Sequence, residues 1–318
     1  MDAVAAHRRT MEVRAGEIAR IAAGVPAGAV LVDVPLYRNI GDLLIHRGTL
    51  AALGDRLRAE FAYSDLGKVR GDAFALGRRI GSLDRAVADA PVLLFQGGGN
   101  LGDLWPNHQL LREALIARYP HVPCVILPQS AHFDGQAALD RCRRIFAAHP
   151  NLTIHCRDTE TLALFGSVAH CTLAPDMAHA LWGMLAASAT RSGTLRQARR
   201  DTERVDGAAG FDWDECQRAV EIAAWRALVT TRRLSAIAPV RVAGDLLWQR
   251  IAARWIDRAV RRIAAAERLV TDRLHGMILA ALVETPVHYA DNRYGKLGRY
   301  AARVFADDPL VQPCAARG

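Results

Sequence analysis

Short apolar, β-branched runs alternate with segments of helical periodicity along most of this chain. Strands that alternate with helices pair in parallel through right-handed crossovers, so the alternation predicts an α/β fold. We expect strands at 29–34, 91–95, 123–127, 152–156, 169–173, 194–198, 268–271 and 286–289, and a short strand or extended connection at 234–242. We expect helices at 42–57, 107–118, 177–187, 212–228, 244–266, 275–283 and 294–305.

A polar stretch of small residues, 189–193, interrupts this alternation. Apolar density falls there, as it does at a domain boundary. We therefore expect two Rossmann-like domains that face a cleft, residues 1–188 and 189–318. Because ligands of doubly wound sheets bind beyond the carboxyl ends of the strands, polar side chains at these ends are the candidates for a site.

The formal net charge is +8, from 41 Lys and Arg against 33 Asp and Glu. Such an excess favours anionic partners, although an arginine-rich composition by itself produces the same charge. The six cysteines form no Cys-x-x-Cys pair and no metal-ligand spacing with histidine, which predicts a reducing compartment and no metal site. The amino-terminal segment lacks the apolar core of a signal peptide, and no apolar run is long enough to span a membrane. We therefore expect a cytoplasmic protein.

Two polar motifs follow the first two expected strands. In Asn39-Ile-Gly-Asp42, Gly41 allows a tight turn and Asp42 can cap the next helix. The segment 96–103 holds three consecutive glycines and formally matches the dinucleotide-binding pattern Gly-x-Gly-x-x-Gly. Asp103 argues against a dinucleotide, because a carboxylate repels phosphate but suits a sugar hydroxyl as hydrogen-bond acceptor or general base.

Later strand ends in the first half carry further polar side chains. Gln129 and Ser130 end the strand that begins at residue 123 and can bind sugar hydroxyls, whereas His132 can equally lie in a solvated loop. Arg157 follows the strand at 152–156, where an arginine usually faces a ligand or an interdomain carboxylate. Asp176, after the next strand, is most simply a helix cap.

The segment Asp272-Arg-Leu-His-Gly276 connects a short strand to an apolar helix. Arg273 and His275 are two residues apart, so extended backbone would place them on one side. A guanidinium forks onto phosphate or carboxylate, a histidine can transfer a proton near neutral pH, and helix amides attract anions. The charged segment 199–203 ends another strand and either points into the same cleft or forms a solvated loop.

The segment 245–263 predicts a basic amphipathic helix, with apolar residues at helical spacing and arginines between them. Its apolar face either packs on the sheet of its domain or contacts an anionic membrane at the periphery.

In this order, the motifs resemble those of the polysaccharide pyruvyl transferase family, in its exopolysaccharide ketal pyruvyltransferase branch. The resemblance is carried by Asn39, Gly41, Asp42, 97–103, 128–130, 157–160, 174–176, 200–203 and 272–276. It implies a fold similar to GT-B glycosyltransferases, phosphoenolpyruvate as the donor and a saccharide acceptor, free or lipid-linked. The product would be a pyruvate ketal across two sugar hydroxyls, with phosphate released. The resemblance implies no metal and no nicotinamide cofactor.

Roles for individual residues follow from the resemblance and from charge. Arg273 and Arg200 would hold the donor's carboxylate and phosphate, with Leu274 and Gly276 beside them. His275 would act as the catalytic acid and Asp103 as the base that accepts the hydroxyl proton. The remaining expected residues are Asn100, Asp42, Gln129, Ser130 and Arg157 for the acceptor, and Gly98, Gly99, Asp201, Glu203 and Asp272 elsewhere in the cleft.

Two other function classes compete with pyruvyl transfer. A GT-B glycosyltransferase that uses a nucleotide sugar would have the same fold, and its arginines would bind pyrophosphate. A non-enzymatic scaffold would dock on a membrane through the basic helix and would not need Asp103 or His275. Nucleic acid is excluded as a partner, because aromatic residues do not interleave with the basic ones.

Overall fold

The computed structural model describes residues 2–70, 73–77, 79–186, 190–200, 209–234, 238–291 and 295–314. The chain forms two compact units, and neither is continuous in sequence. The N-terminal unit comprises residues 16–36 and 45–180, and the C-terminal unit comprises residues 1–15, 37–44 and 181–318. The predicted boundary at residue 189 lies near the junction at 180–181, but the sequence did not predict that 1–15 and 37–44 belong to the C-terminal unit.

The N-terminal unit contains one parallel sheet in the order β2-β1-β5-β7-β8-β9, with β6 also paired to β7. Counted along the chain without β6, this is the 2-1-3-4-5 order of flavodoxin-like sheets, extended by one strand, and it reverses direction between β1 and β5. The strands are β1 (Ala29–Val34), β2 (Leu57–Ala62), β5 (Leu93–Phe95), β6 (Gly98–Gly102), β7 (Cys124–His132), β8 (Leu152–Cys156) and β9 (His170–Leu173).

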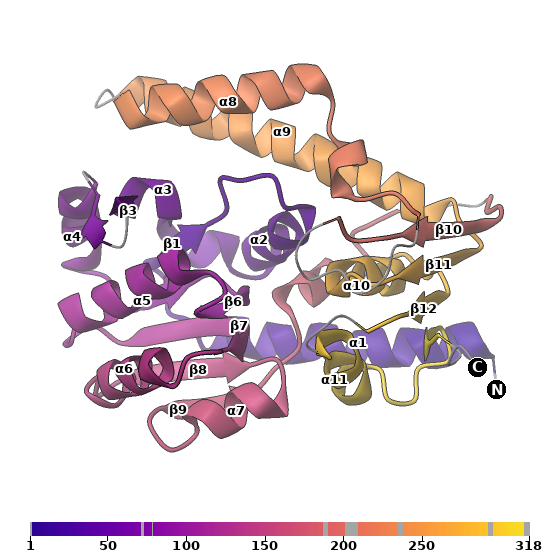
Figure 1. Ribbon diagram of the computed structural model, residues 1–318, viewed down its shortest axis with the longest axis horizontal. Helices are drawn as coiled ribbons and strands as arrows, with labels where there is room; N and C mark the ends of the chain where they lie inside the picture. The colour runs from indigo at the N-terminus through magenta and orange to yellow at the C-terminus, as the bar shows by residue number, and fades with distance from the viewer. Residues whose placement is uncertain are drawn as a thin grey trace. The chain divides into compact units, whose positions relative to one another are not determined.

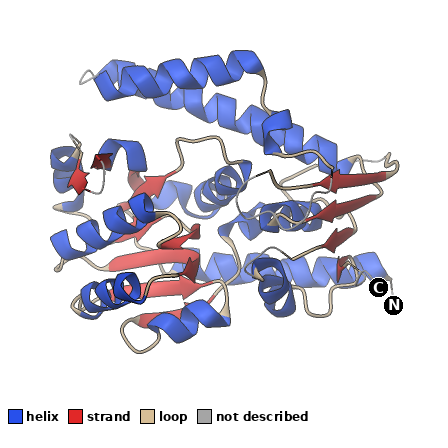
Figure 2. Cartoon of the chain, in the orientation of Figure 1, coloured by secondary structure: helices blue, strands red, loops and turns tan. Residues whose placement is uncertain are grey.

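Helices and one small hairpin complete the N-terminal unit. Strands β3 (Gly67–Arg70) and β4 (Ala73–Leu76) pair in antiparallel fashion beside the main sheet. Helices α5 and α6 lie in front of that sheet in Figures 1 and 2. The helices are α2 (Ile40–Leu53, shared with the other unit), η1 (Gly54–Arg56), α3 (Tyr63–Leu66), α4 (Ile80–Val87), α5 (Pro106–Arg118), α6 (Gln136–Ala147), α7 (Thr159–Phe165) and η2 (Met177–Leu181). The helix expected at 177–187 is wrong, because only the short 3₁₀ turn η2 forms there.

The core of the N-terminal unit lies between the sheet and these helices. Val30, Phe95 and Ile126 from the strands pack with Leu115 and Phe146 from the helices, and all five are fully buried. Apolar runs in parallel strands are covered on both faces, which is why these segments carry few polar residues. Polar side chains also follow these strands directly, as Gln96 follows β5 and Arg157 follows β8, and the candidate site lies at these strand ends.

The C-terminal unit contains a second parallel sheet, in the order β10-β11-β12-β13. Phe211 forms a parallel bridge with Gln197 of β10, so this sheet repeats the 2-1-3-4-5 order with a single residue in place of the second strand. The strands are β10 (Thr194–Gln197), β11 (Arg268–Thr271), β12 (Val287–Tyr289) and β13 (Val311–Pro313). The helices are α1 (Ala3–Ala23, shared with the other unit), η3 (Trp213–Cys216), α8 (Ala219–Leu234), α9 (Ala238–Ala264), α10 (Leu274–Leu282) and α11 (Lys296–Val304).

Two helices of the C-terminal unit differ from expectation. The expected strand or extended connection at 234–242 is wrong for its described residues, since α8 continues to Leu234 and α9 begins at Ala238, and residues 235–237 lie outside the described part of the chain. These two helices run side by side as a hairpin in Figure 1. The helix expected at 212–228 is divided, with η3 ahead of α8.

Buried polar contacts tie α1 to the end of the chain. His7 hydrogen-bonds through Nδ1 to the Asp308 carboxylate at 2.8 Å and through Nε2 to the Ala281 carbonyl at 2.9 Å. His7 and Asp308 are both buried. This pair explains why the first helix belongs to the C-terminal unit although it begins the chain.

The α/β prediction is confirmed, because both sheets are parallel and connected by helices. The GT-B arrangement of two domains across a cleft stays a prediction. Across the residues that the structure describes, we find no helix with both the length and the apolar character needed to cross a membrane.

Candidate functional site

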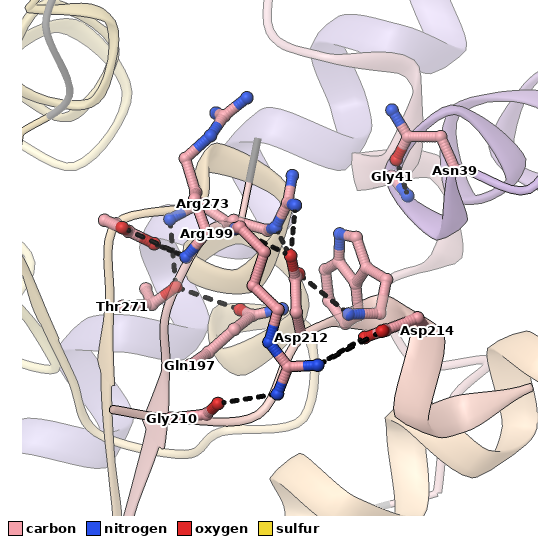
Figure 3. A network of polar contacts seen from close by, with 12 residues as sticks. Asn39, Gly41, Gln197, Arg199, Gly210, Asp212, Asp214, Thr271 and Arg273 are labelled. Carbon is pink, nitrogen blue, oxygen red and sulfur yellow. Dashed lines mark hydrogen bonds and ion pairs between the residues drawn. The ribbon is translucent and has the colours of Figure 1, made fainter. Parts of the chain in front are cut away.

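The carboxyl ends of β10 and β11 meet in a polar network within the C-terminal unit (Figure 3). The backbone amide of Arg199 donates to both oxygens of Asp272, at 2.9 and 3.1 Å. The Thr271 hydroxyl accepts the amide of Arg273 at 3.0 Å and donates to Oε1 of Gln197 at 2.9 Å. Burial raises the pKa of Asp272, the largest effect on this carboxyl. Arg199, from the predicted motif 199–203, therefore meets the motif 272–276 at the carboxyl edge of the sheet, while residues 201–203 lie outside the described residues.

Asp212 joins three segments of this network. Its two oxygens accept Nε and one terminal nitrogen of Arg273, both at 2.5 Å, in a bidentate ion pair (Figure 3). It also accepts the backbone amides of Trp213 at 2.7 Å and Arg200 at 3.2 Å. Asp212 is buried, so the pair fixes the Arg273 guanidinium in one orientation. The sequence reasoning placed Asp212 only at the start of a helix and missed its partner.

Arg200 is held by acidic side chains of the same unit. Its guanidinium donates to Asp214 at 3.1 Å, to Glu215 at 2.6 Å and to the carbonyl of Gly210 at 3.1 Å. The side chain of Arg200 is half-exposed, at 49%, so solvent weakens these pairs. Asp201 and Glu203, also predicted in this region, lie outside the described residues.

His275 contacts the amino terminus of α2, which belongs to the same unit. A Cβ atom placed on Gly41 would lie 2.5 Å from Nδ1 of His275, so the imidazole packs directly over the glycine backbone. Oδ1 of Asn39 accepts the amide of Gly41 at 3.0 Å (Figure 3). Asn39 thus caps α2, and the interpretation of Asp42 as its cap is wrong, because the helix begins at Ile40 and Asp42 lies in its first turn. The structure places Asp42 with His275 in the C-terminal unit rather than with the other expected acceptor residues.

Helix α10 begins at Leu274, directly after the strand end. The expectation that Arg273 and His275 project together from extended backbone is wrong, because the amide of Met277 already donates to the carbonyl of Arg273 in the first helical turn. A Cβ on Gly276 would lie 1.9 Å from Oε1 of Gln197, so close packing against Gln197 is enough to explain the glycine. Leu274 is buried. Contact of Leu274 and Gly276 with a donor stays a prediction.

The glycine-rich segment forms strand β6, which the sequence did not predict. Gly98 and Gly102 have φ angles of 147° and 128°, which side chains rarely adopt. A Cβ on Gly102 would lie 1.8 Å from the carbonyl oxygen of His132 on β7. A Cβ on Gly99 would lie 3.1 Å from the guanidinium of Arg157. Close approach of β6 to its neighbours is therefore sufficient to explain these glycines.

Asn100 begins a second polar network, at the carboxyl ends of β1, β5 and β7 in the N-terminal unit. Its Oδ1 accepts Nε2 of Gln129 and a terminal nitrogen of Arg112, both at 2.9 Å. Arg112 also reaches the carboxylate of Asp33 at 3.4 Å, and Nδ1 of His108 lies 2.7 Å from the same carboxylate. The sequence reasoning predicted Asn100 and Gln129 but missed Asp33, His108 and Arg112. Two sequence signals could have indicated these three residues: an acid inside an apolar strand, and two basic residues four apart on one helix.

Asp33 has the backbone geometry that often accompanies a functional position. Its φ angle is 66°, and the pairing register of β1 shifts between Val32 and Val34. The side chain is buried at the point where the strand order reverses, which is where ligands of such sheets bind. Burial, together with the Asp33 charge, raises the pKa of Tyr63, whose ring lies 4.8 Å from that of His108.

Arg157 and Ser130 belong to a buried cluster beside this network. Arg157 pairs with Asp176 at 2.5 Å and donates to the Ser130 hydroxyl at 3.1 Å. The carboxylate partner of Arg157 therefore lies in its own unit. Asp176 also accepts the amide of Ala178 at 2.9 Å, which confirms its capping contact.

Asp103 directly follows β6, and its side chain contacts the turn before α6. Its carboxylate accepts the amide of Asp134 at 3.0 Å and the amide of Gly135 at 2.8 Å. His132 hydrogen-bonds the Asp134 side chain at 3.0 Å. Asp103 thus holds the turn at 134–135, a role that the sequence did not indicate.

Comparisons with known proteins identify the family. The model of the family described as polysaccharide pyruvyl transferase matches residues 39–294. This chain belongs to the polysaccharide pyruvyl transferase family. It is 33% identical over 283 residues to the Bacillus subtilis (strain 168) protein named "Putative pyruvyl transferase EpsO", covering 85% of this chain and 83% of that protein. It is 28% identical to "Pyruvyl transferase 1" of Schizosaccharomyces pombe, covering 85% and 68% of the two chains.

A solved structure also resembles the chain in fold. A functionally uncharacterised protein from Klebsiella pneumoniae superimposes with a TM-score of 0.54 at 18% identity, covering 93% of this chain and 95% of that one. At this identity the similarity concerns the fold alone. The family match, residues 39–294, contains the residues of both polar networks except Asp33.

Proposed function

We propose that this member of the polysaccharide pyruvyl transferase family transfers the pyruvyl group of phosphoenolpyruvate to two hydroxyls of a sugar and releases phosphate. The observation that carries the proposal is the fixed Arg273–Asp212 pair, at a strand end that continues directly into the turn bearing His275. A dianionic donor needs cations at set positions, and an arginine oriented by a buried carboxylate supplies one.

On the donor side, Arg273 and Arg200 are the cations that we assign to phosphoenolpyruvate. Both guanidiniums are already oriented by acidic side chains, those of Asp212, Asp214 and Glu215. A guanidinium has five N–H donors, which is more than a single carboxylate can accept. Such pairing therefore orients the side chain without using its full hydrogen-bonding capacity. The half-exposed Arg200 would adjust to the donor, whereas the more buried Arg273 would keep its position.

The proposed reaction balances as follows. The methylene carbon of the donor gains one proton, and the first sugar hydroxyl adds to the adjacent carbon and loses its proton. The bond from that carbon to the phosphate oxygen then breaks, and the second hydroxyl adds with loss of its proton. Two protons leave the sugar hydroxyls. One makes up for the proton that turned the methylene carbon into a methyl group, and the other leaves on the phosphate. We assign His275 to deliver the proton, because its position over the α2 terminus is fixed by Gly41.

On the acceptor side, we assign His108 to receive the hydroxyl proton. The Asp33 carboxylate, 2.7 Å from Nδ1, would hold the proton on that nitrogen and leave Nε2 as the basic one. Asp103 was the base expected from the sequence, and its carboxylate accepts two backbone amides of the 134–135 turn. Asn100 and Gln129 would position the sugar from the same network.

Phosphate release with phosphoenolpyruvate and a panel of β-galactosides, glucosides and mannosides tests the proposal. Thermal shift with phosphoenolpyruvate and with nucleotide sugars separates it from the glycosyltransferase alternative, because only a ligand that binds the native state stabilises it. Stabilisation by nucleotide sugars alone would overturn the proposed donor.

Substitutions separate the two assignments for the base. His108→Gln should lower turnover by about 10²-fold or more, in the range typical of a lost proton transfer. Asp103→Asn should act mainly on thermal stability, because it weakens the 134–135 turn. If Asp103→Asn lowered turnover and His108→Gln acted mainly on thermal stability, Asp103 would be the base. His275→Ala should abolish phosphate release with the fold intact, and near wild-type release would remove the proposed acid.

A further inference from the structure

The first turns of α9 present large apolar side chains to solvent. Val240, Val242, Leu246 and Leu247 are 51%, 54%, 52% and 44% exposed. These four residues do not belong to the side of α9 that packs in the core, because another side of the same helix buries Trp248, Ile251 and Trp255. An apolar group of this kind on a long helix indicates a surface that contacts something apolar.

Arginines continue this face toward the end of the helix. Val242, Leu246, Arg250 and Arg254 are spaced by four residues, so they form one stripe along α9. Arg250 and Arg254 are exposed. Within the described ranges neither arginine forms an ion pair. We call the six residues Val240, Val242, Leu246, Leu247, Arg250 and Arg254 the α9 stripe.

Two acidic residues of the hairpin are engaged by basic side chains outside the α9 stripe. Asp245 pairs with Arg232 of α8. Glu221 is buried and accepts hydrogen bonds from Arg258 and from the Trp255 indole. The stripe therefore combines exposed apolar side chains with two exposed arginines.

We propose that the α9 stripe docks this protein on an anionic phospholipid surface. Leucine and valine side chains would enter the boundary between headgroups and acyl chains, and Arg250 and Arg254 would contact headgroup phosphates. The charge complementarity favours an anionic membrane over a second copy of this chain, because the α9 stripe of a second copy offers no acidic residue to the arginines. Docking is independent of the donor, and it would bring the enzyme to lipid-linked saccharides if those are its acceptors.

Vesicle co-sedimentation of the full chain tests this proposal. The protein should sediment with vesicles of phosphatidylcholine and phosphatidylglycerol and remain in solution with phosphatidylcholine alone. Binding should fall in about 1 M KCl, where the screening length shrinks to about 3 Å. Absence of sedimentation with the anionic vesicles would overturn the proposal.

Paired variants locate the contact. Leu246→Ser/Leu247→Ser and Arg250→Ser/Arg254→Ser should each lower the partition coefficient by about tenfold or more, since both apolar insertion and charge are required. Val13→Ser/Met184→Ser is the matched control, because these exposed apolar side chains lie outside the stripe. Circular dichroism of each variant checks that it is folded. Unchanged binding of the leucine variant, or dimerisation of the wild type that the leucine variant abolishes, would show that the stripe does not serve a membrane.

Discussion

Gly41 and His275 are in direct contact, although they lie far apart in sequence. A methyl group at position 41 would come within 2.5 Å of Nδ1 of His275 and within 3.1 Å of its Cβ. Asn39 caps the helix that carries Gly41, so the backbone beneath the imidazole is itself fixed. The glycine therefore provides the space in which His275 is held.

Gly41→Ala should displace the imidazole and lower phosphate release by about 10²-fold or more, the scale of a misplaced proton donor. Thermal unfolding should change little, because alanine suits a helix better than glycine. Gly81→Ala is the control, since a Cβ there meets no atom within 4 Å, and it should leave turnover unchanged. Wild-type turnover of Gly41→Ala would show that the position of His275 does not limit the reaction.

Asp212→Asn should raise the KM for phosphoenolpyruvate by about tenfold, because a hydrogen bond to a charged partner is worth about 1.5–3 kcal/mol. Asparagine still caps η3, so the fold should be kept. Asp214→Asn is the matched comparison, because its partner Arg200 is half-exposed and also bonded to Glu215, and it should change KM less than about threefold. Steady-state kinetics at varied donor concentration measure both, and equal effects would contradict the special role of Asp212.

Arg157→Met should destabilise the N-terminal unit by about 3–5 kcal/mol, because it leaves the buried Asp176 carboxylate without its cation. Arg157→Met/Asp176→Asn should recover part of the loss. Arg118→Met breaks the exposed pair with Asp84 and should cost less than about 1 kcal/mol. Urea denaturation gives the three values. A loss for Arg157→Met as small as that for Arg118→Met would contradict the burial of the pair.

His155 makes stability depend on pH in a defined direction. Burial, with a smaller contribution from His170, lowers its pKa from 6.5 to about 4, so the folded state binds this proton less readily than the unfolded chain. The contribution of neutral His155 to the free energy of unfolding is therefore complete above about pH 6.5. It is lost as the pH falls toward 4, by roughly 3 kcal/mol in all. His155→Asn should flatten this part of the profile. Urea midpoints between pH 4 and 7 test it, and identical profiles would contradict the assignment.

The sequence predicted elements whose physics is local. The bounds of β1, β8 and β11 agree with expectation because a proline or a charged residue, Pro35, Arg157 or Asp272, directly follows each of them. Strand β6 was missed because glycine is a poor strand former, and only its pairing with β7 holds it extended. Strand β2 was missed because charged residues alternate with apolar ones near the edge of the sheet.

The sequence by itself determined the α/β class, the family and the motifs that carry Arg273, His275, Asn100 and Gln129. Only the tertiary structure decided their partners. Asp212 lies 61 residues from Arg273 and Asp33 lies 75 residues from His108, and neither separation leaves a periodic signal. Such pairs form when packed strands bring distant loops to one edge, so the geometry of the sheet, rather than the motif, selects which carboxylate orients which cation.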